Sequence, residues 1–480
     1  MATLVNGFPT KEFFVEMLTR DIDLTDAILD LLDNCLDGVL RKKGVSTNSS
    51  NPDIDYSGYS ANITITNDSF SIQDNCGGIS KYIAINSAFR MGREANSSQD
   101  NNLPTVGIYG IGMKRAIFKI GREAKIISKC NDEQFVVTIP DEWTKNDSWN
   151  LELQDISSVP DGIADGGVIV TVTQLNQSIA ALWADDRRKN FINNLINAVQ
   201  KSYSLIIEKG FSITINDIEV KSWPVKFMIS APEKGKGAIG PYIYKDTIDG
   251  VNVDLIIGFY RPVVSADEID EINATHRSSS DAGWTVVCND RVVLYNDKTH
   301  LTGWGEGGTP KYHTQFIGIR GMVFFRSNNP KLLPTTTTKR GIDLSSAVYS
   351  QVKERMREGL NLFISYTNQW KGRLDEEKKH SKATDNVSMH TLLSDQTIQD
   401  KYNLSSTIRS KRGSTGTTFV PTLPKPETTS NTQVIRYFKP VDQIEFLAEC
   451  LFDQTLDDIK ASVIGEKCFD LIYKRFKGEK

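Results

Sequence analysis

The sequence predicts an α+β protein built from two mixed domains and a small helical tail. The chain has 480 residues, which is too long for one ordinary domain, because domains average roughly 150 residues. Helix and strand patterns occur in both long parts, and a polar stretch precedes two final amphipathic helices. The predicted divisions are a first domain over 1–180, a second over 181–379, a flexible linker over 380–435 and a small helical segment over 436–480.

The first domain is predicted to begin with helix and to continue mainly as strands. Residues 10–40 have a helical pattern, and Thr10 or Thr25 could cap a helix start. Alternating apolar residues over 62–74 predict a hairpin with its turn at 67–68. The other predicted elements are loops over 41–61 and 92–106, a helix over 111–121, and strands over 124–130, 134–140 and 166–175.

The second domain is predicted to be strand-rich between two helices. A helical stretch covers 181–209, and a long helix over 346–379 closes the domain. Ser, Thr, Asn and Lys then dominate up to residue 435, as in a flexible tether. The strands between the helices are predicted at 211–217, 251–260, 283–295 and 316–325, and the tail helices near 441–452 and 455–476.

Composition excludes several classes of protein. A net charge of −4 gives no overall basic field for nucleic acid or an anionic membrane. There is no run of about 18 apolar residues for a membrane span, and the first residues lack a secretory pattern. The six cysteines form no CxxC pair, so we expect no zinc site and free thiols in a reducing cytoplasm.

The stretch AILDLLDNCLDGV, residues 27–39, places acids and an amide in an otherwise apolar helix. Asp30, Asn34 and Asp37 lie one and two turns apart and therefore share one face. The amide oxygen of Asn34 is a hard donor suited to Mg²⁺, and a carboxylate one turn earlier can orient or deprotonate a water. Taken alone, this face is more simply interpreted as the solvated side of a surface helix.

The stretch QDNCGGIS, residues 73–80, follows the predicted hairpin. Its glycine pair lets the backbone approach a ligand closely, while Asp74 can face that ligand. A carboxylate can accept a hydrogen bond from an exocyclic amine such as that of adenine. An ordinary Asp/Asn/Gly turn is the alternative interpretation.

A third stretch, VGIYGIGMKRAIFKIG at 106–121, places three glycines directly before a helix. Backbone amides at a helix N-terminus can bind phosphate, and Lys114 adds a cation there. The GxxGxG spacing is neither that of a Rossmann motif nor that of a P-loop. Taken alone, the glycines could simply serve the entry into the helix.

In their order and spacing, these motifs resemble the GHKL ATPases, which include gyrase, heat-shock chaperones, histidine kinases, MutL and the MORC proteins. The chain has DLLDNCLDG at 30–38 for a family pattern like ELxDNSxDA, and DNCGGI at 74–79 for DNGxGI. It has GIYGIGMK at 107–114 for GxYGxGLK, and GVIVTVTQL at 167–175 for GTxVxxxxL. The resemblance covers about residues 10–180, and the length and order of the chain are most similar to those of bacterial MORC-like members.

The resemblance implies a Bergerat-type α/β sandwich that binds ATP and Mg²⁺. It also implies a following transducer domain with a ribosomal-protein-like βαβ crossover. The stretch GWTVVCNDRVV at 283–293 is similar to a strand pair of that domain. The stretch at 324–343 resembles the lysine loop of MORC proteins and chaperones, so Lys339 would contact the γ-phosphate.

The resemblance also implies a role for each motif residue. Asp30 would be the general base, Asn34 would hold Mg²⁺, and Asp37 would support the site through water or Lys contacts. Asp74 would bind the adenine amino group, and the glycine-rich segment would form a mobile lid. The expected catalytic residues are Asp30 and Lys339, and the expected ATP-binding residues are Asn34, Asp37, Asp74, Gly78, Ile79, Met91, Gly107, Gly110, Ile111, Gly112, Met113 and Lys114.

Three residues depart from the family pattern. Asp30 replaces a glutamate, and the loss of one methylene moves the carboxylate by roughly one ångström, enough to slow water activation on the order of 100-fold. Cys76 replaces a glycine, and Val168 replaces a threonine. We therefore expect ATP binding with slow hydrolysis, and a pseudo-ATPase that only binds ATP is the alternative.

The predicted function is an ATP-gated homodimer in which residues 7–24 could swap between protomers or pack on their own domain. A MORC-like protein could embrace DNA or act in anti-phage defence, although only the stretch 408–416 is locally basic. The alternatives are a scaffold whose tail helices recruit partner proteins, and a chaperone-like remodelling ATPase. A histidine kinase is disfavoured, because no phospho-acceptor helix is recognisable among the five histidines.

Overall fold

The computed structural model divides the chain into two compact units, Met1–Pro426 and Glu427–Lys480. The larger unit is mixed α+β and contains two large sheets, in agreement with the predicted fold class. The structure describes residues 10–44, 54–92, 103–107, 110–146, 148–232, 237–274, 281–336, 338–404, 416–426, 435, 438–456 and 458–477.

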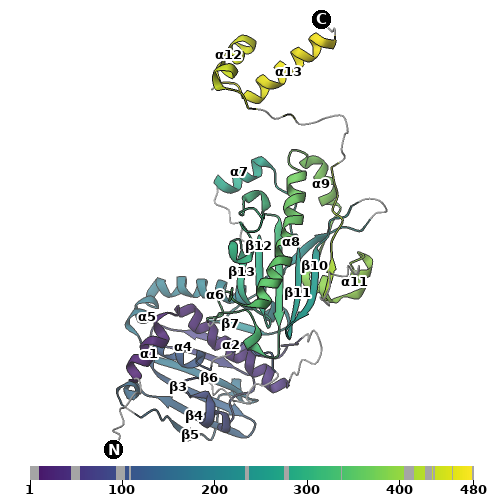
Figure 1. Ribbon diagram of the computed structural model, residues 1–480. Coiled ribbons are helices and arrows are strands. Elements are labelled where there is room, and N and C mark those ends of the chain that lie inside the picture. Colours follow the sequence, from purple (N-terminus) through teal and green to yellow (C-terminus); the bar gives the residue numbers. More distant parts are fainter. Residues whose placement is uncertain are drawn as a thin grey trace, which may run out of the picture. The chain divides into compact units, whose positions relative to one another are not determined.

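An eight-stranded sheet forms the first part of the larger unit (Figure 1). Its strand order is β5-β4-β3-β6-β2-β1-β7-β8, and neighbours are antiparallel except for the parallel pair β1 and β7. The predicted hairpin over 62–74 is confirmed as the antiparallel pair β1 and β2. The strands are β1 Ser60–Ile65, β2 Phe70–Asp74, β3 Gly121–Cys130, β4 Glu133–Ile139, β5 Glu152–Asp155, β6 Gly167–Leu175, β7 Ser212–Ile215 and β8 Ile218–Glu219.

Helices α1, α2 and α4 lie on one face of this sheet (Figure 1), and α6 shares the same hydrophobic core. The apolar positions of α2 are buried, among them Ile28, Leu32 and Leu36. The helices are α1 Lys11–Arg20, α2 Leu24–Lys43, α3 Lys81–Ile83, α4 Gly112–Ile120, α5 Gln177–Leu182 and α6 Asp185–Glu208, with a π-helix η1 Ala84–Ala88 and 3₁₀ turns η2 Asp141–Lys145 and η3 Asp161–Ile163.

The first helices begin and end at ordinary capping residues. The Thr10 hydroxyl accepts a hydrogen bond from the Phe13 N–H at 3.4 Å, so Thr10 caps α1 as predicted. Thr25 caps no helix, because α2 already begins at the preceding residue. Gly44 ends α2 in the left-handed conformation, with φ 60°, and its N–H binds the Leu40 carbonyl.

The first sheet extends beyond residue 180, where the sequence predicts the domain boundary. Strand β7 pairs with β1, and α6 buries Leu195, Val199 and Tyr203 in the core of the first sheet. The boundary is hard to place from sequence, because the pairing of β7 joins strands that are distant along the chain.

A six-stranded sheet forms the second part of the larger unit, in the order β13-β12-β14-β11-β10-β16. Among its described strands the parallel pair is β12 and β14, which are joined through β13 and two 3₁₀ turns rather than through the expected βαβ crossover. The strands are β9 Lys226–Ile229, β10 Tyr242–Ile248, β11 Val251–Phe259, β12 Gly283–Cys288, β13 Arg291–Asp297, β14 Ile319–Arg326, β15 Asp385–Ser388 and β16 Thr417–Phe419.

Helix α8 lies along this second sheet and buries Val352, Met356 and Phe363 against it. The long helix predicted over 346–379 is interrupted, because α8 ends at Gln369 and a new helix begins at Leu374. The helices and turns of this part are α7 Ala266–Ala274, α8 Ala347–Gln369, α9 Leu374–Lys382, α10 Met389–Ser394, α11 Gln396–Lys401, η4 His300–Thr302, η5 Thr314–Phe316 and η6 Pro330–Leu332.

The segment 380–435 differs from the expected flexible linker. Strand β15 pairs with β9, and β16 adds to the edge of the second sheet beside β10. Leu392 and Tyr402 are buried against the same part of the molecule. These short strands are held by backbone pairing to distant strands, which a polar composition does not reveal. The basic stretch 408–416 lies, except for its last residue, outside the described residues.

The smaller unit contains two helices, α12 Val441–Phe452 and α13 Ala461–Lys477, close to the two predicted there. Several of their large apolar side chains are exposed, including Phe446, Phe469 and Ile472. Within the described parts of the chain, no helix has both the length and the apolar character that crossing a bilayer requires.

Candidate functional site

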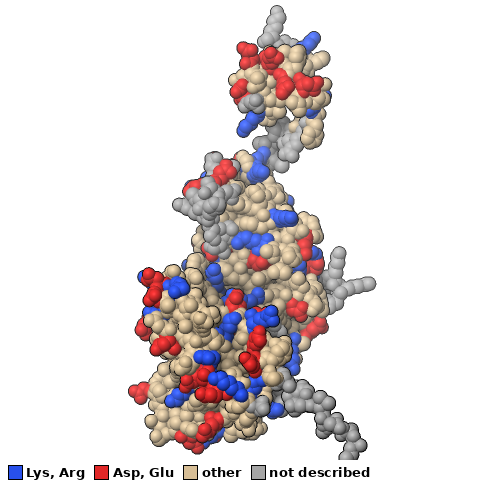
Figure 2. Space-filling model, turned by 90° about the vertical axis from the view of Figure 1, so that its left-hand side faces the viewer, with Lys and Arg blue, Asp and Glu red and all other residues tan. Residues whose placement is uncertain are grey.

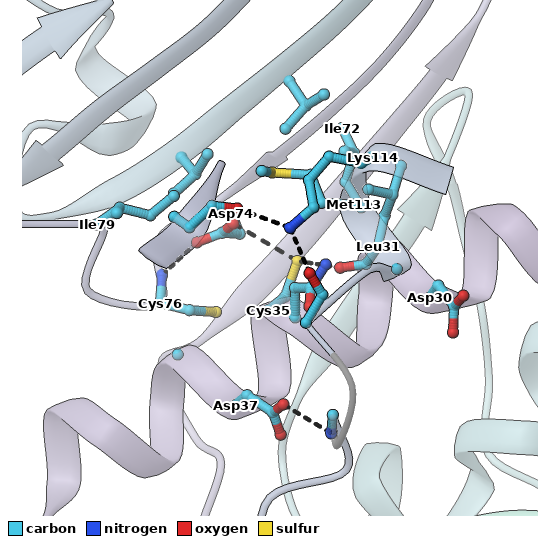
Figure 3. A pocket seen from close by; sticks show the side chains of 18 of the residues that line it. Asp30, Leu31, Cys35, Asp37, Ile72, Asp74, Cys76, Ile79, Met113 and Lys114 are labelled. Carbon is cyan, nitrogen blue, oxygen red and sulfur yellow. Dashed lines mark hydrogen bonds between the residues drawn. The ribbon is translucent and has the colours of Figure 1, made fainter. Parts of the chain in front are cut away.

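A cavity lies between α2, β2, the start of α4 and the loop that carries Lys339. It brings together residues from all three motifs and from the second part of the chain, and Figure 3 shows its interior. Its lining includes every predicted site residue except Met91, which packs half-buried against the first core. The full lining is Asp30, Leu31, Asn34, Cys35, Asp37, Gly38, Arg41, Ile72, Asp74, Cys76, Gly78, Ile79, Ile83, Ser87, Ala88, Gly107, Gly110, Ile111, Gly112, Met113, Lys114, Arg115, Val168, Val170 and Lys339.

Asp74 stands at the end of β2, near Ile79 and away from Asp30 (Figure 3). Its carboxylate accepts a hydrogen bond from the Cys76 N–H at 2.8 Å and has the Cys35 thiol at 3.5 Å. Burial raises the pKa of Asp74 to about 6. A buried carboxylate has several lone pairs, so Asp74 can also accept a hydrogen bond from a ligand amine.

The loop after β2 is held against β3. The Ile79 N–H donates to the Ser128 hydroxyl at 2.7 Å, and that hydroxyl donates to the Ile79 carbonyl at 3.0 Å. Gly78 has φ +74°, and a Cβ there would lie 1.9 Å from the Lys129 carbonyl oxygen. Only glycine therefore fits, and Ile79 is fixed as one wall of the cavity. Sequence analysis did not identify Ser128.

The departure at Cys76 is matched by a change in the first motif. A Cβ at Gly38 would lie 2.8 Å from the Cys76 carbonyl oxygen and 3.1 Å from the Cys76 Cβ. Residue 38 is alanine in the family pattern, so the chain has a smaller residue opposite the larger one. The cysteine is thus accommodated, with its side chain almost wholly buried. Val168, the other departure on this side, lines the cavity from β6.

Asp37 binds the start of the glycine-rich segment rather than a lysine. Its two oxygens accept hydrogen bonds from the backbone N–H groups of Val106 at 2.7 Å and Gly107 at 2.8 Å. Burial raises the pKa of Asp37, although these amides and Arg41 oppose the shift. Helix α2 therefore fixes the point from which this segment departs.

Lys114, the predicted phosphate cation, is directed at backbone carbonyls. Its ammonium donates to the carbonyl of Ala88 at 2.9 Å and makes a close contact with that of Gly110. The side chain thereby joins the glycine-rich segment to η1 while still lining the cavity. Of the predicted lid, Ile108 and Tyr109 lie outside the described residues.

Asp30 is engaged by two cations. Its Oδ2 forms a close ion pair with Arg115 of α4, and its Oδ1 lies 3.3 Å from the ammonium of Lys339. Lys339 also approaches Asp33 at 2.8 Å. Although burial alone would lower the pKa of Lys339, the carboxylates of Asp33 and Asp30 raise it overall.

Asp33, Arg115 and Arg291 belong to the site but were not predicted from the sequence. Asp33 follows Asp30 by three residues, so helical periodicity could have placed both on neighbouring parts of one face. Arg115 directly follows the recognised Lys114. Nothing local distinguishes Arg291, because its partner Asp33 is distant in the sequence.

Comparison with known proteins agrees with this arrangement. Residues 22–164 match the family model described as "Histidine kinase-, DNA gyrase B-, and HSP90-like ATPase". No curated protein matches the chain. The matched segment contains the acidic helix, the DNCGGI loop and the glycine-rich segment, and it supports ATP binding and the placement of this part of the chain in the GHKL ATPase superfamily.

Proposed function

We propose that the chain is a Mg²⁺-dependent ATPase with slow turnover, in which nucleotide binding changes the conformation of the protein. The observation that carries this proposal is the position of Lys339. This lysine belongs to the second part of the chain, yet it lines the same cavity as the three motifs of the matched family. A site that combines an adenine-type acceptor with a buried lysine fits a nucleoside triphosphate.

In this proposal, Asp74 accepts the adenine amino group, and Ile79, Ile72 and Val170 provide apolar walls. The ammonium of Lys339 and the guanidinium of Arg115 pair with Asp30 and would receive the phosphates. Figure 3 shows Asp30 and Asp74 well apart from each other. Removal of such anions from water is favourable only when cations and backbone amides replace the lost hydration.

Asn34 is the residue that would hold Mg²⁺. Its side chain is exposed on α2, within the cavity lining, and its amide oxygen is a hard donor. The described residues contain no group of three or more His, Cys, Asp or Glu suited to a metal ion. Mg²⁺ would therefore complete its coordination with phosphate oxygens and water, and it would neutralise charge on the phosphates.

The contacts of Asp30 support slow hydrolysis. Arg115 pairs with one carboxylate oxygen and Lys339 with the other, so both cations restrain the carboxylate from turning towards an attacking water. Asp30 would act more effectively as the general base once one of these cations turns towards a phosphate. The shorter side chain of aspartate adds to this restraint, because its carboxylate reaches less far than that of glutamate.

Binding and turnover of single variants test this proposal. Calorimetry with ATP·Mg²⁺ should give heat for the wild type, and Asp74→Asn should bind on the order of 10- to 100-fold more weakly, since a charged hydrogen bond contributes about 1.5–3 kcal/mol. Asp30→Ala should retain binding and lose phosphate release. No heat with the wild type, or a Kd unaffected by Asp74→Asn, would contradict the proposal.

Nucleotide-dependent homodimerisation is part of the proposal. Phe13 and Met17 are exposed one turn apart on α1, and Tyr82 and Ile85 are exposed beside the loop that follows the second motif. A second copy of the chain is the occupant that would cover these side chains. In the single chain, α1 packs on α4 of its own domain, and the Lys11 ammonium donates to the carbonyl of Trp143 in η2, so a swap would need both contacts to open.

The wider assignments rest on the resemblance. A MORC-like role and anti-phage defence are supported by motif order and length alone. Binding of DNA has little support, because Figure 2 shows acidic and basic side chains interspersed over the described part of the viewed face of Met1–Pro426. All six cysteines are free, which fits a reducing cytoplasm.

The alternative that the chain is a scaffold is supported by the exposed apolar side chains of its two C-terminal helices. Helices α12 and α13 expose Phe446, Phe469, Ile472 and Phe476, an unusual amount of apolar surface for two short helices. A partner protein bound to this unit would cover them. Removing residues 427–480 should then abolish partner capture without changing the Kd for ATP.

A further inference from the structure

Asp33 lies behind the cavity and gathers three groups that are distant in the sequence. Its Oδ2 accepts from the Lys339 ammonium at 2.8 Å, and its Oδ1 lies 3.0 Å from the Arg291 Nε and 2.7 Å from the Tyr203 hydroxyl. Its side chain is 1% exposed, and it does not belong to the cavity lining described above. Asp33 therefore acts on the site only through the groups that it binds.

Positive and negative side chains alternate in a row that passes through Asp33. From the start of α4 to the second sheet, the order is Arg115, Asp30, Lys339, Asp33 and Arg291. Each carboxylate lies between two cations, and the row as a whole has one more cation than anions. Although burial alone would raise the pKa of Asp33, Lys339 and Arg291 lower it overall, so Asp33 remains an anion. An incoming phosphate would meet a cation already in place.

The backbone at Lys339 also needs an external restraint. Its φ of 56° lies in the left-handed region, which is unfavourable for a residue with a side chain. The turn is closed by the Lys339 N–H on the Thr336 carbonyl at 3.0 Å and the Thr336 N–H on the Gly341 carbonyl at 3.1 Å. Such a conformation persists where surrounding contacts fix it, and the ion pair with Asp33 is one of those contacts.

We propose that Asp33 is a positioning residue that holds the Lys339 ammonium at the phosphate end of the cavity. Arg291 and Tyr203 hold Asp33 in turn, so the second sheet takes part in setting the position of the lysine. This inference rests on the proposed function, because it assigns Lys339 to the terminal phosphate of ATP. Asp33 does not line the cavity, so it would act on a nucleotide only through the groups that it binds.

A comparison of two nucleotides separates positioning from stability. The affinities of the full chain for a non-hydrolysable ATP analogue and for ADP are measured by calorimetry. The affinity for the ATP analogue divided by that for ADP is the ratio that reports the contribution of the terminal phosphate. Asp33→Asn should lower this ratio by about tenfold, since losing a charge-assisted hydrogen bond that preorganises a cation typically costs that much. The affinity for ADP should remain within about threefold of the wild type.

Asp290 provides a matched control. Like Asp33, Asp290 is a buried carboxylate paired with a cation, here Lys209 at 2.8 Å. It lies on the β12–β13 turn and does not contact Lys339. Asp290→Asn should lower the thermal unfolding temperature as Asp33→Asn does, while leaving the ratio of the two affinities unchanged. In the Lys339→Ala background, Asp33→Asn should have no further effect on that ratio.

The ratio of the two affinities in the variants decides whether Asp33 positions Lys339. An unchanged or increased ratio in Asp33→Asn, or an equal decrease in Asp290→Asn, overturns the positioning role. If Asp33→Asn does not fold, Tyr203→Phe, which removes one hydroxyl from Asp33, should lower the same ratio by a smaller factor, and no decrease overturns the role. A wild type that binds neither nucleotide refutes the proposed function itself, and this inference with it.

Discussion

Replacement of Asp74 by asparagine should stabilise the nucleotide-free protein. Asp74 is 8% exposed, and burial raises the pKa of its carboxyl group from 3.8 to about 6. In the unfolded chain the ordinary value returns, so above pH 6 the folded state holds an anion that the unfolded state solvates better. A pKa difference of about 2 units corresponds to a free energy of unfolding lower by about 3 kcal/mol, at about 1.36 kcal/mol per unit.

The sign of the pH dependence follows from the raised pKa of Asp74. Between pH 3.8 and 6 the folded state binds more protons than the unfolded state, so stability falls as the pH rises through this window. The cost is fully present above pH 6 and absent below pH 3.8. Asparagine has nearly the same shape without the charge, so Asp74→Asn should gain up to about 3 kcal/mol near pH 7.5 and progressively less at lower pH.

Urea unfolding without nucleotide, followed between about pH 7.5 and 4, measures this difference. Asp132→Asn, at an exposed position of the β3–β4 turn, is the control and should leave the free energy of unfolding unchanged at every pH. A variant no more stable than the wild type near pH 7.5, or a difference independent of pH, refutes the reasoning. The same substitution should weaken ATP binding, because the site keeps an unfavourable buried charge in order to bind its ligand.

Three further predictions concern the walls of the site and the first helix. Gly38→Ala should lower the free energy of unfolding by about 1–3 kcal/mol, because its Cβ would lie 2.8 Å from the Cys76 carbonyl oxygen and 3.1 Å from the Cys76 Cβ. Cys76→Gly in the same chain removes the second of these contacts and should restore part of the loss in urea unfolding. Lys11→Met should lower the free energy of unfolding by about 1–3 kcal/mol and speed hydrogen exchange in α1. The reason is that the Lys11 ammonium donates to the Trp143 carbonyl and lies 4.1 Å from the centre of the Trp143 ring. Unchanged hydrogen exchange in α1 would contradict this. Serine at both Phe13 and Met17 should abolish ATP-dependent dimers in sedimentation while the unfolding temperature stays the same, and persistent dimers would exclude this surface.

The sequence was most informative where local spacing decides the structure. Helical periodicity places Asp30, Asn34 and Asp37 on one face of α2, and all three line the cavity. The partners of these residues were harder to predict. Asp37 accepts hydrogen bonds from the backbone amides of Val106 and Gly107, and Lys114 donates to backbone carbonyls. Such choices depend on how the backbone is folded around each side chain, which spacing does not contain.

Long-range pairing accounts for the remaining differences. Strand β7 joins the first sheet through β1, and β16 joins the second through β10, although each is short and distant from its partner in the sequence. The pair formed by Asp33 and Arg291 has the same origin, because the two residues lie far apart in the sequence, on α2 and on β13. Local patterns therefore predicted the elements, and the tertiary structure determined which of them belong together.

Helix α2 connects the parts of the site, because its polar residues have different partners. Asp37 holds the start of the glycine-rich segment, Asp30 binds Arg115 of α4, and Asp33 binds Arg291 of the second sheet. Lys339 is shared between Asp30 and Asp33. A triphosphate in the proposed site would compete with Asp30 for Arg115 and Lys339, while Asp33 and Arg291 keep Lys339 in position. Binding would then change the contacts of α2 to α4 and to the Lys339 loop together, which is how a nucleotide in one domain could alter the other.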